Sequence, residues 1–584
     1  MKRLIVLFGF VLAAAGCGNW AGDGRGTDRS GEETVVPVTG ISGALPGKIV
    51  AGYEADLNGY ITVEPEDATR QTIVWTIKID GVPAADAADG VFTPAKTGTL
   101  HITGKIPGGK AGGGDFELPA YTVTVISVED YVPVTGISGV PERRFAGVPL
   151  DLSTVTVTPE DATYNRIVWS IENAGTTGAA IGKNSALTAS SAGTLTLRGA
   201  VNGLEGPSVR DFTIEINALP LDWTKAANVP DAMPGEIQTV CYGIVNGQGL
   251  FVAGSRENDG RIAWSDDGGA TWHGLDSAAT TFQDSIDGKV VGNFAHVRFL
   301  NGKFWAVGGN GHMAKSEDGK TWTAVASPGI KQNIVDIAYG EVDGYVDGVF
   351  VAGGDRGTMS YSTDGGATWT ANDQTVYFTA GGSTADFKVI TFAAGKFLAA
   401  GQFAKTVYSS DGITWTDVSG TIKTDIIRHY NNWPTSSGHL GLSVAAYGAG
   451  VYVIGGQGVL GISADLENWE RIDMEAFGFP RGRRPGWINS LIYADGLFVL
   501  GGGDGNAAYS ADGREWIRIG TTNPVFHNFH FINGLAYDGK GGFVAAGATC
   551  GNPNSHSSTS LSEYDHLGNV GCVAYITPAG GENP

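Results

Sequence analysis

The C-terminal part of this sequence repeats one turn formula, Ser-x-Asp-(x)-Gly-x-x-Trp, at intervals of about 50 residues. A period of this size is typical of repeat folds, in which each unit buries its apolar face only against its neighbours. One copy is decayed, because Leu466 or Glu467 stands where the others have Gly. The six copies contain Ser265, Asp267, Gly269 and Trp272; Ser316, Asp318, Gly319 and Trp322; Ser362, Asp364, Gly366 and Trp369; Ser409, Asp411, Gly412 and Trp415; Ser463, Asp465 and Trp469; and Ser510, Asp512, Gly513 and Trp516.

Between these turns, each unit has the same succession of short apolar strands. A strand such as Val444–Tyr447 leads through a tight turn to a strand that ends in Gly, such as Val451–Gly455, and a third strand runs into the repeated turn. The 90 Gly and 57 aromatic residues suit many short strands joined by tight turns. We therefore predict an all-β fold with seven like sheets in residues 219–584. Their inner strands are expected near Val240, Val297, Ile337, Val389, Val444, Leu491 and Leu535.

The seventh unit has no copy of the turn formula and lacks its last strand. Just before the first unit, however, the segment Leu221–Thr224 resembles the strands that end the other units. We predict that this strand, near residues 221–225, completes the seventh sheet. The ring would then be closed by its own two ends, with no sheet edge left open.

The repeated turn has a structural chemistry. Ser and Asp side chains accept backbone N–H groups, Gly supplies a positive φ, and Trp packs between neighbouring sheets. The string Asp266–Gly269 could be taken for a calcium loop, but no acid follows at the spacing that an EF-hand needs. We expect neither a metal nor a cofactor.

These turns resemble the Asp-box, or bacterial neuraminidase repeat, of sialidase-type β-propellers. The resemblance implies a β-propeller, here with seven blades, whose Asp-box turns lie on the face away from the ligand. The catalytic motif of sialidases is missing: Val297-Arg298-Phe299 is the nearest string to their Arg-Ile-Pro motif and does not match it. Sialidases are also expected to have six blades. The resemblance therefore supports the fold more than an enzymatic activity.

A second repeat, with a shift of about 95 residues, precedes the propeller. Residues 36–42 return at 132–138, and the PEDAT turn at 65–69 returns at 159–163. Short alternating runs separated by Gly, Pro and Asp are typical of an antiparallel sandwich. The two copies, 35–128 and 129–218, resemble bacterial Ig-like domains of the group 2 type. Such tandem domains serve as spacers or as adhesins, and we favour spacers.

The N-terminus predicts export. Lys2 and Arg3 precede an apolar run that is too short to span a bilayer, followed by small residues and Cys17. This segment, 1–17, resembles a lipoprotein signal with a lipobox, in which Cys17 is acylated; the alternative is an ordinary secretory signal. Residues 18–34 are Gly-rich and polar, as in a flexible tether. We expect a lipid-anchored protein of the bacterial cell envelope, at the outer membrane or cell surface.

Charge and cysteine content narrow the partners further. The formal net charge of −22 disfavours nucleic acid, because the phosphate backbone would be repelled. If Cys17 is lipidated, three cysteines remain, and Cys550 and Cys572 flank an insertion in the last unit that a disulfide would hold. Cys241 aligns with Ala338 and Ala446 and is expected to be a small buried residue.

Ligands of propellers bind at the channel mouth, among the loops from each outer strand to the next inner strand and the hairpins between second and third strands. Several of these loops are long and carry aromatic side chains, which suit sugar rings, and Arg, which suits carboxylates. The same residues could instead only anchor the loops. The candidate ligand contacts are Arg428, His429, Tyr430, Trp433, Phe479, Arg481, Arg483, Arg484, Trp487 and His527.

The sequence contains no complete catalytic set. We therefore expect a monomeric, non-enzymatic protein that binds a glycan or a protein through its propeller. One alternative is a glycoside hydrolase or lyase with an unfamiliar pair of carboxylates. Another is an envelope assembly factor, which predicts an exposed apolar patch.

Overall fold

The computed structural model is all-β and divides into two compact units, Met1–Pro133 with Ala162–Tyr164, and Val134–Asp161 with Asn165–Pro584. Among the residues that it describes, no helix is long and apolar enough to cross a membrane. The described residues are 35–80, 82–83, 89–182, 185–204, 206–220, 223–233, 235–256, 261–275, 294–325, 329–372, 379–380, 383–427, 441–479, 486–519, 531–549 and 570–576.

The first unit contains a β-sandwich. Its core surrounds Trp75, which is buried among aliphatic side chains of the sheets. The main sheet has the order β2-β10-β8-β5-β6, with β9 paired to β8. Two separate short strand pairs, β1-β4 and β3-β7, complete the sandwich. The strands are β1 (Gly40–Ser42), β2 (Lys48–Val50), β3 (Ala55–Asp56), β4 (Thr62–Glu64), β5 (Val74–Ile79), β6 (Val82–Pro83), β7 (Val91–Phe92), β8 (Gly98–Ile106), β9 (Phe116–Glu117) and β10 (Tyr121–Ile126).

The second unit begins with a sandwich of related topology. As in the first sandwich, the first strand forms a short pair with the fourth strand (β11-β14). The parallel pair β12-β19 adjoins the longest hairpin, β18-β19. Trp169 differs from Trp75: it is only half-buried and lies 6.0 Å from the ring of Phe212. The strands are β11 (Gly136–Ser138), β12 (Arg143–Phe145), β13 (Leu150–Asp151), β14 (Thr156–Thr158), β15 (Ile167–Asn173), β16 (Ala180–Ile181), β17 (Ala186–Thr188), β18 (Gly193–Val201) and β19 (Ser208–Asn217).

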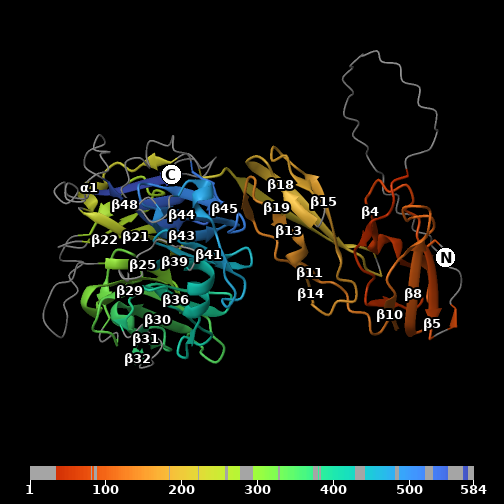
Figure 1. Ribbon diagram of the computed structural model, residues 1–584, viewed down its shortest axis with the longest axis horizontal. Helices are drawn as coiled ribbons and strands as arrows, with labels where there is room; N and C mark the ends of the chain where they lie inside the picture. The colour runs from red at the N-terminus through yellow and green to blue at the C-terminus, as the bar shows by residue number, and fades with distance from the viewer. Residues whose placement is uncertain are drawn as a thin grey trace, which may run out of the picture. The chain divides into compact units, whose positions relative to one another are not determined.

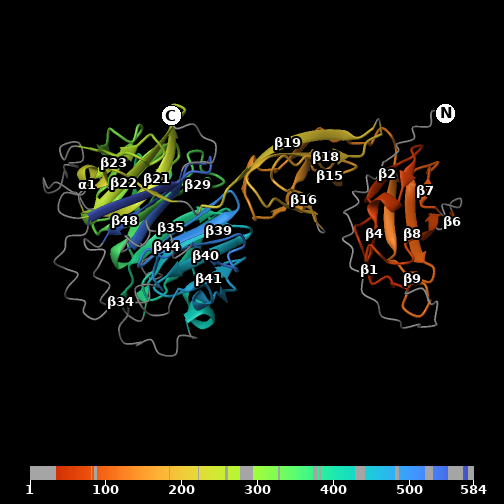
Figure 2. The same ribbon diagram turned by 90° about the horizontal axis from the view of Figure 1, so that it is seen from above.

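The rest of the second unit is a β-propeller. Its described residues form seven four-stranded antiparallel sheets, which we number 1 to 7 along the chain. Each inner strand lies beside the inner strand of the next sheet, and β47 of sheet 7 returns to β21 of sheet 1. Figures 1 and 2 accordingly show the blue strand β48 beside the yellow-green strands β21 and β22.

The strands of sheets 1 to 3 are β21 (Glu236–Val245), β22 (Gln248–Arg256), β23 (Ile262–Ser265) and β24 (His273–Gly274); β25 (Phe294–Leu300), β26 (Lys303–Gly308), β27 (Met313–Ser316) and β28 (Thr323–Ala324); and β29 (Ile334–Gly340), β30 (Val349–Gly354), β31 (Met359–Ser362) and β32 (Thr370–Asn372). Those of sheets 4 and 5 are β35 (Phe387–Ala393), β36 (Lys396–Gly401), β37 (Thr406–Ser409) and β38 (Thr416–Asp417); and β39 (Leu442–Gly448), β40 (Val451–Gly456), β41 (Leu460–Ser463) and β42 (Glu470–Arg471). Those of sheets 6 and 7 are β43 (Ile488–Ala494), β44 (Leu497–Gly502), β45 (Ala507–Ser510) and β46 (Ile517–Arg518); and β47 (Phe531–Tyr537), β48 (Phe543–Thr549), β49 (Val570–Ile576) and β20 (Thr224–Lys225). A small hairpin, β33 (Thr379–Ala380) and β34 (Ser383–Thr384), and two one-turn helices, α1 (Val229–Ala232) and α2 (Ser419–Ile422), lie outside the sheets.

An aromatic pair near the end of each inner strand connects the first and second strands of the same sheet. The ring centroids of each pair are 4.6 to 4.9 Å apart. The next sheet's aromatic ring can also lie directly on the backbone: a Cβ on Gly340 would come within 2.4 Å of the Phe392 ring. The pairs are Tyr242–Phe251, Phe299–Phe304, Tyr339–Phe350, Phe392–Phe397, Tyr447–Tyr452, Tyr493–Phe498 and Tyr537–Phe543.

The repeated Ser-Asp turns join the third and fourth strands of sheets 1 to 6. In sheet 2, Ser316 Oγ accepts the N–H of Gly319 at 2.8 Å, and Asp318 Oδ1 accepts the N–H of Thr321 at 2.6 Å. The indole of Trp322 donates to Gly319 O at 3.2 Å. Corresponding Ser and Asp bonds occur in the other five turns. In the decayed copy it is Leu466 that takes the position of Gly, with a φ of 70°.

The turn glycine is needed for its conformation and for its lack of a side chain. Gly412 has a φ of +73°, and a Cβ there would lie 2.8 Å from Val351 of the preceding sheet. Gly412→Ala is expected to lower the free energy of unfolding by about 2–4 kcal/mol, from a strained backbone and an overpacked contact. Gly395→Ala is the matched control, because its φ is +71° but open space surrounds its Cβ. Equal losses in urea denaturation of the two variants would rule out the packing contribution.

The strand before the first sheet completes the last one. Thr224 and Lys225 of β20 pair with Tyr575 and Ala574 of β49, which gives sheet 7 the order β20-β49-β48-β47. Trp223 is buried next to this strand, and its indole donates to Pro220 O at 3.0 Å. The two ends of the propeller therefore share one sheet.

The second sandwich packs on sheets 6 and 7. Phe145, 1% exposed, lies 6.1 Å from the ring of Tyr537 and 5.7 Å from that of Phe543. Arg143 Nη1 donates to Gly539 O at 3.1 Å. Because Phe145 belongs to the same apolar cluster as Trp223, this sandwich and the closure of the ring share one core.

The structure describes two of the cysteines, Cys241 and Cys572. Cys572 lies buried on β49, and the sequence predicts a bridge from it to Cys550. Cys550 lies outside the described residues, so the bridge stays a prediction. Cys241 is half-buried on β21, where burial raises the pKa of its thiol to about 12 against the opposing charge of Arg298.

Candidate binding site at the channel mouth

Each of the seven inner strands contains a β-bulge close to its beginning. The extra residue follows the first or the second residue of the inner strand that pairs with the second strand. A bulge leaves one residue out of the ladder and changes the direction of its side chain. All seven extra residues are half-buried and line one central cavity. They are Gln238, Ala295, Val335, Lys388, Ser443, Asn489 and Asn533, which we call the bulge ring.

The cavity has a volume of about 620 Å³, within the range of small-molecule sites. Its walls come from the beginnings of inner strands and the ends of second strands, so it opens on the face where we expected a ligand. The rings of Trp487 and Phe531 line it, 6.3 Å apart and inclined by 23°. Six amide side chains also line it: Gln238, Asn333, Gln402, Gln457, Asn489 and Asn533.

The charged groups of the cavity are mostly paired. Lys388 Nζ lies 3.4 Å from Asp386 Oδ2 and 4.0 Å from Asp355 Oδ1. Asp355 also accepts from Asn333 Nδ2 at 2.7 Å, and Glu236 accepts from Asn533 Nδ2 at 2.8 Å. The arrangement fixes side chains around the mouth and gives the lining more carboxylates than ammonium groups.

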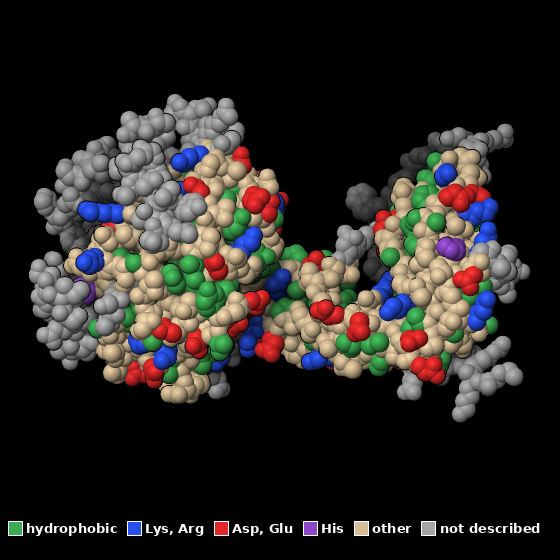
Figure 3. Space-filling model, turned by 90° about the horizontal axis from the view of Figure 1, so that it is seen from below, with side chains coloured by type: hydrophobic (Ala, Val, Ile, Leu, Met, Phe, Trp, Pro, Cys, Tyr) green, Lys and Arg blue, Asp and Glu red, His purple; other side chains and the backbone are tan. Residues whose placement is uncertain are grey.

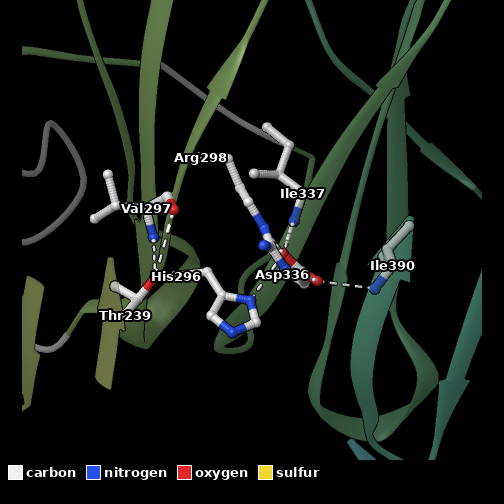
Figure 4. Close-up of polar contacts among 7 residues, drawn as sticks. All are labelled: Thr239, His296, Val297, Arg298, Asp336, Ile337 and Ile390. Atoms are coloured by element: carbon white, nitrogen blue, oxygen red, sulfur yellow. Dashed lines mark hydrogen bonds and ion pairs between the residues drawn. The ribbon is translucent and has the colours of Figure 1, made fainter. Parts of the chain in front are cut away.

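A buried carboxylate, Asp336, lies in the channel wall and joins three inner strands (Figure 4). Both of its oxygens are 3.0 Å from the Arg298 guanidinium on β25, which binds it in a bidentate manner. His296 Nδ1, also on β25, is 2.8 Å from Asp336 Oδ1. The backbone N–H groups of Ile337 on β29 and Ile390 on β35 each donate at 2.9 Å. This network joins sheets 2, 3 and 4.

Burial alone would raise the pKa of Asp336, but Arg298 and His296 outweigh it and hold the pKa well below its usual range. The Asp336 side chain is 1% exposed and is a carboxylate at neutral pH. The same attraction raises the pKa of Arg298 against the effect of burial. Asp336 is therefore a structural anion rather than a proton donor.

The Asp336 network also orients His296. The ring nitrogen opposite Asp336 points away from the carboxylate (Figure 4). His296 lines both the 620 Å³ cavity and a second cavity of about 370 Å³ deeper in the channel. The imidazole thus lies where the mouth joins the channel interior.

The sequence-predicted contacts have different outcomes. Trp487 lines the cavity, whereas Phe479 does not: it is fully buried, 5.1 Å from the ring of Phe477, in the core beneath sheets 5 and 6. We expected Phe479 to face a ligand because it lies in a long aromatic loop, but its ring fills the core that supports that loop. The other candidates lie outside the described residues: Arg428, His429, Tyr430, Trp433, Arg481, Arg483, Arg484 and His527.

Sequence reasoning missed the bulge ring, Phe531 and Asp336. A signal was present, because the inner strands align as EIQTV, NIVDI, GLSVA, WINSL and FINGL, with a half-buried residue at the third position. Within a single strand, that residue cannot be told from a residue of the ladder.

Comparisons with known proteins concern the propeller. A family model described as the DUF6242 beta propeller domain matches residues 220–381. No curated protein sequence matches the chain. Similar solved structures include "YCF48 bound to D1 peptide", at 15% identity over 62% of this chain and 99% of that one, with a TM-score of 0.40. YCF48 from Cyanidioschyzon merolae has 16% identity over 60% and 98%, with a TM-score of 0.38. The WD40 beta propeller domain of Doa1 has 13% identity over 59% and 94%, with a TM-score of 0.37. The chain is thus similar to the DUF6242 beta propeller domain over strand β20 and sheets 1 to 3.

Proposed function

We propose that this protein is a lipid-anchored protein of the bacterial cell envelope whose propeller binds a glycan at the channel mouth without catalysis. The observation that carries the proposal is the cavity itself, which six amide side chains line together with an aromatic pair, Trp487 and Phe531. Amides both donate and accept hydrogen bonds, as hydroxyl groups require. Aromatic faces supply a flat apolar surface for the C–H groups of a sugar ring.

The architecture of the proposal has seven Asp-box blades behind two Ig-like domains at 35–128 and 129–218, which act as spacers. Seven four-stranded sheets and six Ser-Asp turns support the blades, and the related strand pairings of the two sandwiches support the duplication. Lipidation at Cys17, with 18–34 as a tether, would place the propeller beyond the membrane surface.

Hydrolysis is the second candidate, because Asp355 and Asp386 both face the cavity. Glycoside hydrolases use a pair of carboxyl groups, one of which protonates the leaving group. Both carboxylates here lie within 4.0 Å of the Lys388 ammonium, so each already has an ion-pair partner. That pairing favours binding over acid catalysis.

An assembly factor would require an exposed apolar patch for its client. Among the described residues of the propeller, the exposed large apolar side chains Ile244, Val346 and Ile517 lie on β21, between β29 and β30, and on β46. On the face drawn in Figure 3, the hydrophobic side chains of the propeller have acidic and basic side chains around them. This distribution does not favour a client-binding surface.

The test is a glycan array probed with the protein, followed by titration calorimetry with the strongest ligand. Trp487→Ala is expected to weaken binding at least about tenfold, because it removes an aromatic contact. Trp264→Ala, on the third strand of sheet 1, is the matched control and is expected to bind as the parent does. No glycan bound, or equal loss in both variants, would contradict the proposal. Release of reducing sugar from the ligand would show that the protein hydrolyses the glycan, which would contradict non-catalytic binding.

A further inference from the structure

We infer that the bulge ring determines ligand specificity and that its asymmetry selects a neutral sugar, an inference that rests on the proposed function. Five consecutive sheets, from sheet 4 through sheet 7 to sheet 1, place polar side chains in the ring, whereas sheets 2 and 3 place apolar ones. The polar arc is Lys388, Ser443, Asn489, Asn533 and Gln238; the apolar arc is Ala295 and Val335.

A sugar ring has the matching asymmetry. Its hydroxyl groups form hydrogen bonds, and its C–H groups behave as apolar surface. The two arcs face one cavity, so a ring bound there contacts amides with one edge and Ala295 and Val335 with another. An apolar ligand would leave the amides of the polar arc without partners, which costs binding energy.

Hydrogen-bonding groups in the polar arc are available to a ligand. Within the described part of the chain, the Gln238 amide makes no hydrogen bond. Asn489 donates one N–H to Asn533 Oδ1 at 3.0 Å, which leaves its own carbonyl oxygen to accept. Both groups lie in the cavity lining.

The polar arc is also held in place before any ligand binds. Ser443 Oγ donates to Ile488 O of the next sheet at 2.7 Å. Asn489 is bonded to Asn533, and Asn533 donates to Ile237 O of sheet 1 at 3.0 Å. Because these bonds join sheets 5, 6, 7 and 1, the side chains lose little freedom on binding, which favours affinity and specificity.

The charged side chains that line the cavity favour neutral sugars over acidic ones. The described lining contains Glu236, Asp355 and Asp386 against the single ammonium of Lys388, with His296 at its base. A carboxylate or sulfate on a ligand would meet this excess of negative charge, in a protein of net charge −22. The site therefore takes neutral glycans in preference to acidic ones.

The experiment compares two glutamines at opposite ends of one strand pair. Gln238 is in the bulge ring, whereas Gln248 is exposed at the far hairpin between β21 and β22. The full chain and its variants are titrated with the strongest neutral glycan of the array and with an acidic glycan of the same backbone. Gln238→Ala and Asn489→Ala are each expected to weaken neutral-glycan binding about tenfold, whereas Gln248→Ala leaves it unchanged. The midpoint of thermal unfolding serves as the folding control, and Gln238→Ala is expected to leave it unchanged.

The outcomes separate this inference from the proposed function. Glycan binding that depends on Trp487 but not on Gln238 or Asn489 overturns the role of the bulge ring and leaves the function standing. Tighter binding of the acidic glycan overturns the charge selection in the same way. Absence of glycan binding overturns both.

Discussion

Replacing Asp336 with Ala is expected to lower the free energy of unfolding of the propeller by about 3–5 kcal/mol. The substitution leaves the Arg298 guanidinium without its bidentate partner and two backbone N–H groups, of Ile337 and Ile390, without an acceptor. Since Asp336 joins strands β25, β29 and β35, the loss affects three sheets at once. Urea denaturation followed by tryptophan fluorescence measures it.

Asp355→Ala is the matched control. Asp355 also has an amide donor and a nearby lysine, but its side chain is 30% exposed, and its loss is expected to cost less than about 1 kcal/mol. Equal costs at the two positions would show that Asp336 does not link the sheets as we describe.

The pH dependence of stability gives a second measure of the same carboxylate. The pKa of Asp336 is lower in the folded state than its unfolded value of about 3.9, so its stabilisation is complete above that pH and is lost as the pH falls. The turn carboxylates act in the same direction: hydrogen bonds from Thr368 and neighbouring groups lower the pKa of Asp364 to about 2. Stability is expected to fall below about pH 4, and less steeply in Asp336→Ala than in the parent. Parallel pH profiles would contradict this.

Trp223→Ala is expected to open the closure of the ring and to cost about 3–5 kcal/mol. The indole is buried 6.3 Å from the ring of Phe543, in the cluster that also holds Phe145. The effect is expected to be large and confined to sheet 7, because β20 pairs with β49 and with no other of the described strands. Hydrogen exchange is therefore expected to accelerate most at Ala574 and Tyr575, the partners of Lys225 and Thr224.

Thr224→Ala is the control for that experiment. Its side chain is exposed while its backbone pairing is the same, so its cost is expected to stay below about 0.5 kcal/mol. If Trp223→Ala accelerates exchange no more in β49 than in inner strands such as β35, the closing strand is not what holds sheet 7.

Several features of the fold could be predicted because their causes are local in sequence. The Ser and Asp side chains of the turns form hydrogen bonds with residues two to four positions away, so one copy is enough to recognise the chemistry and six copies give the spacing. The strand near residues 221–225 could be predicted from the sequence for a related reason. The missing strand of the last unit and the surplus strand before the first have matching patterns, although 350 residues separate Thr224 from its partner Tyr575.

Less of the candidate site could be predicted from the sequence, because the site depends on how neighbouring strands pair. A bulge is a difference in register between two paired strands, so the composition of one strand does not reveal that Gln238 or Asn489 faces the channel. Arg298 was noticed only as a poor match to a catalytic motif. Its actual partner, Asp336, lies 38 residues away on the next inner strand.

The sequence by itself determined the repeat, its turns and the strands that close the ring. Periodic burial and short-range hydrogen bonds depend on residues that are close together in the sequence, so the sequence pattern shows them directly. Only the tertiary structure decided which side chains meet at the channel. It buries Phe479 in the core and exposes Trp487 to the cavity, although the two lie in one aromatic loop. The physical reason is that a seven-sheet ring brings the same position of every inner strand to one axis, and contacts between neighbouring sheets around that axis join residues that no local pattern connects.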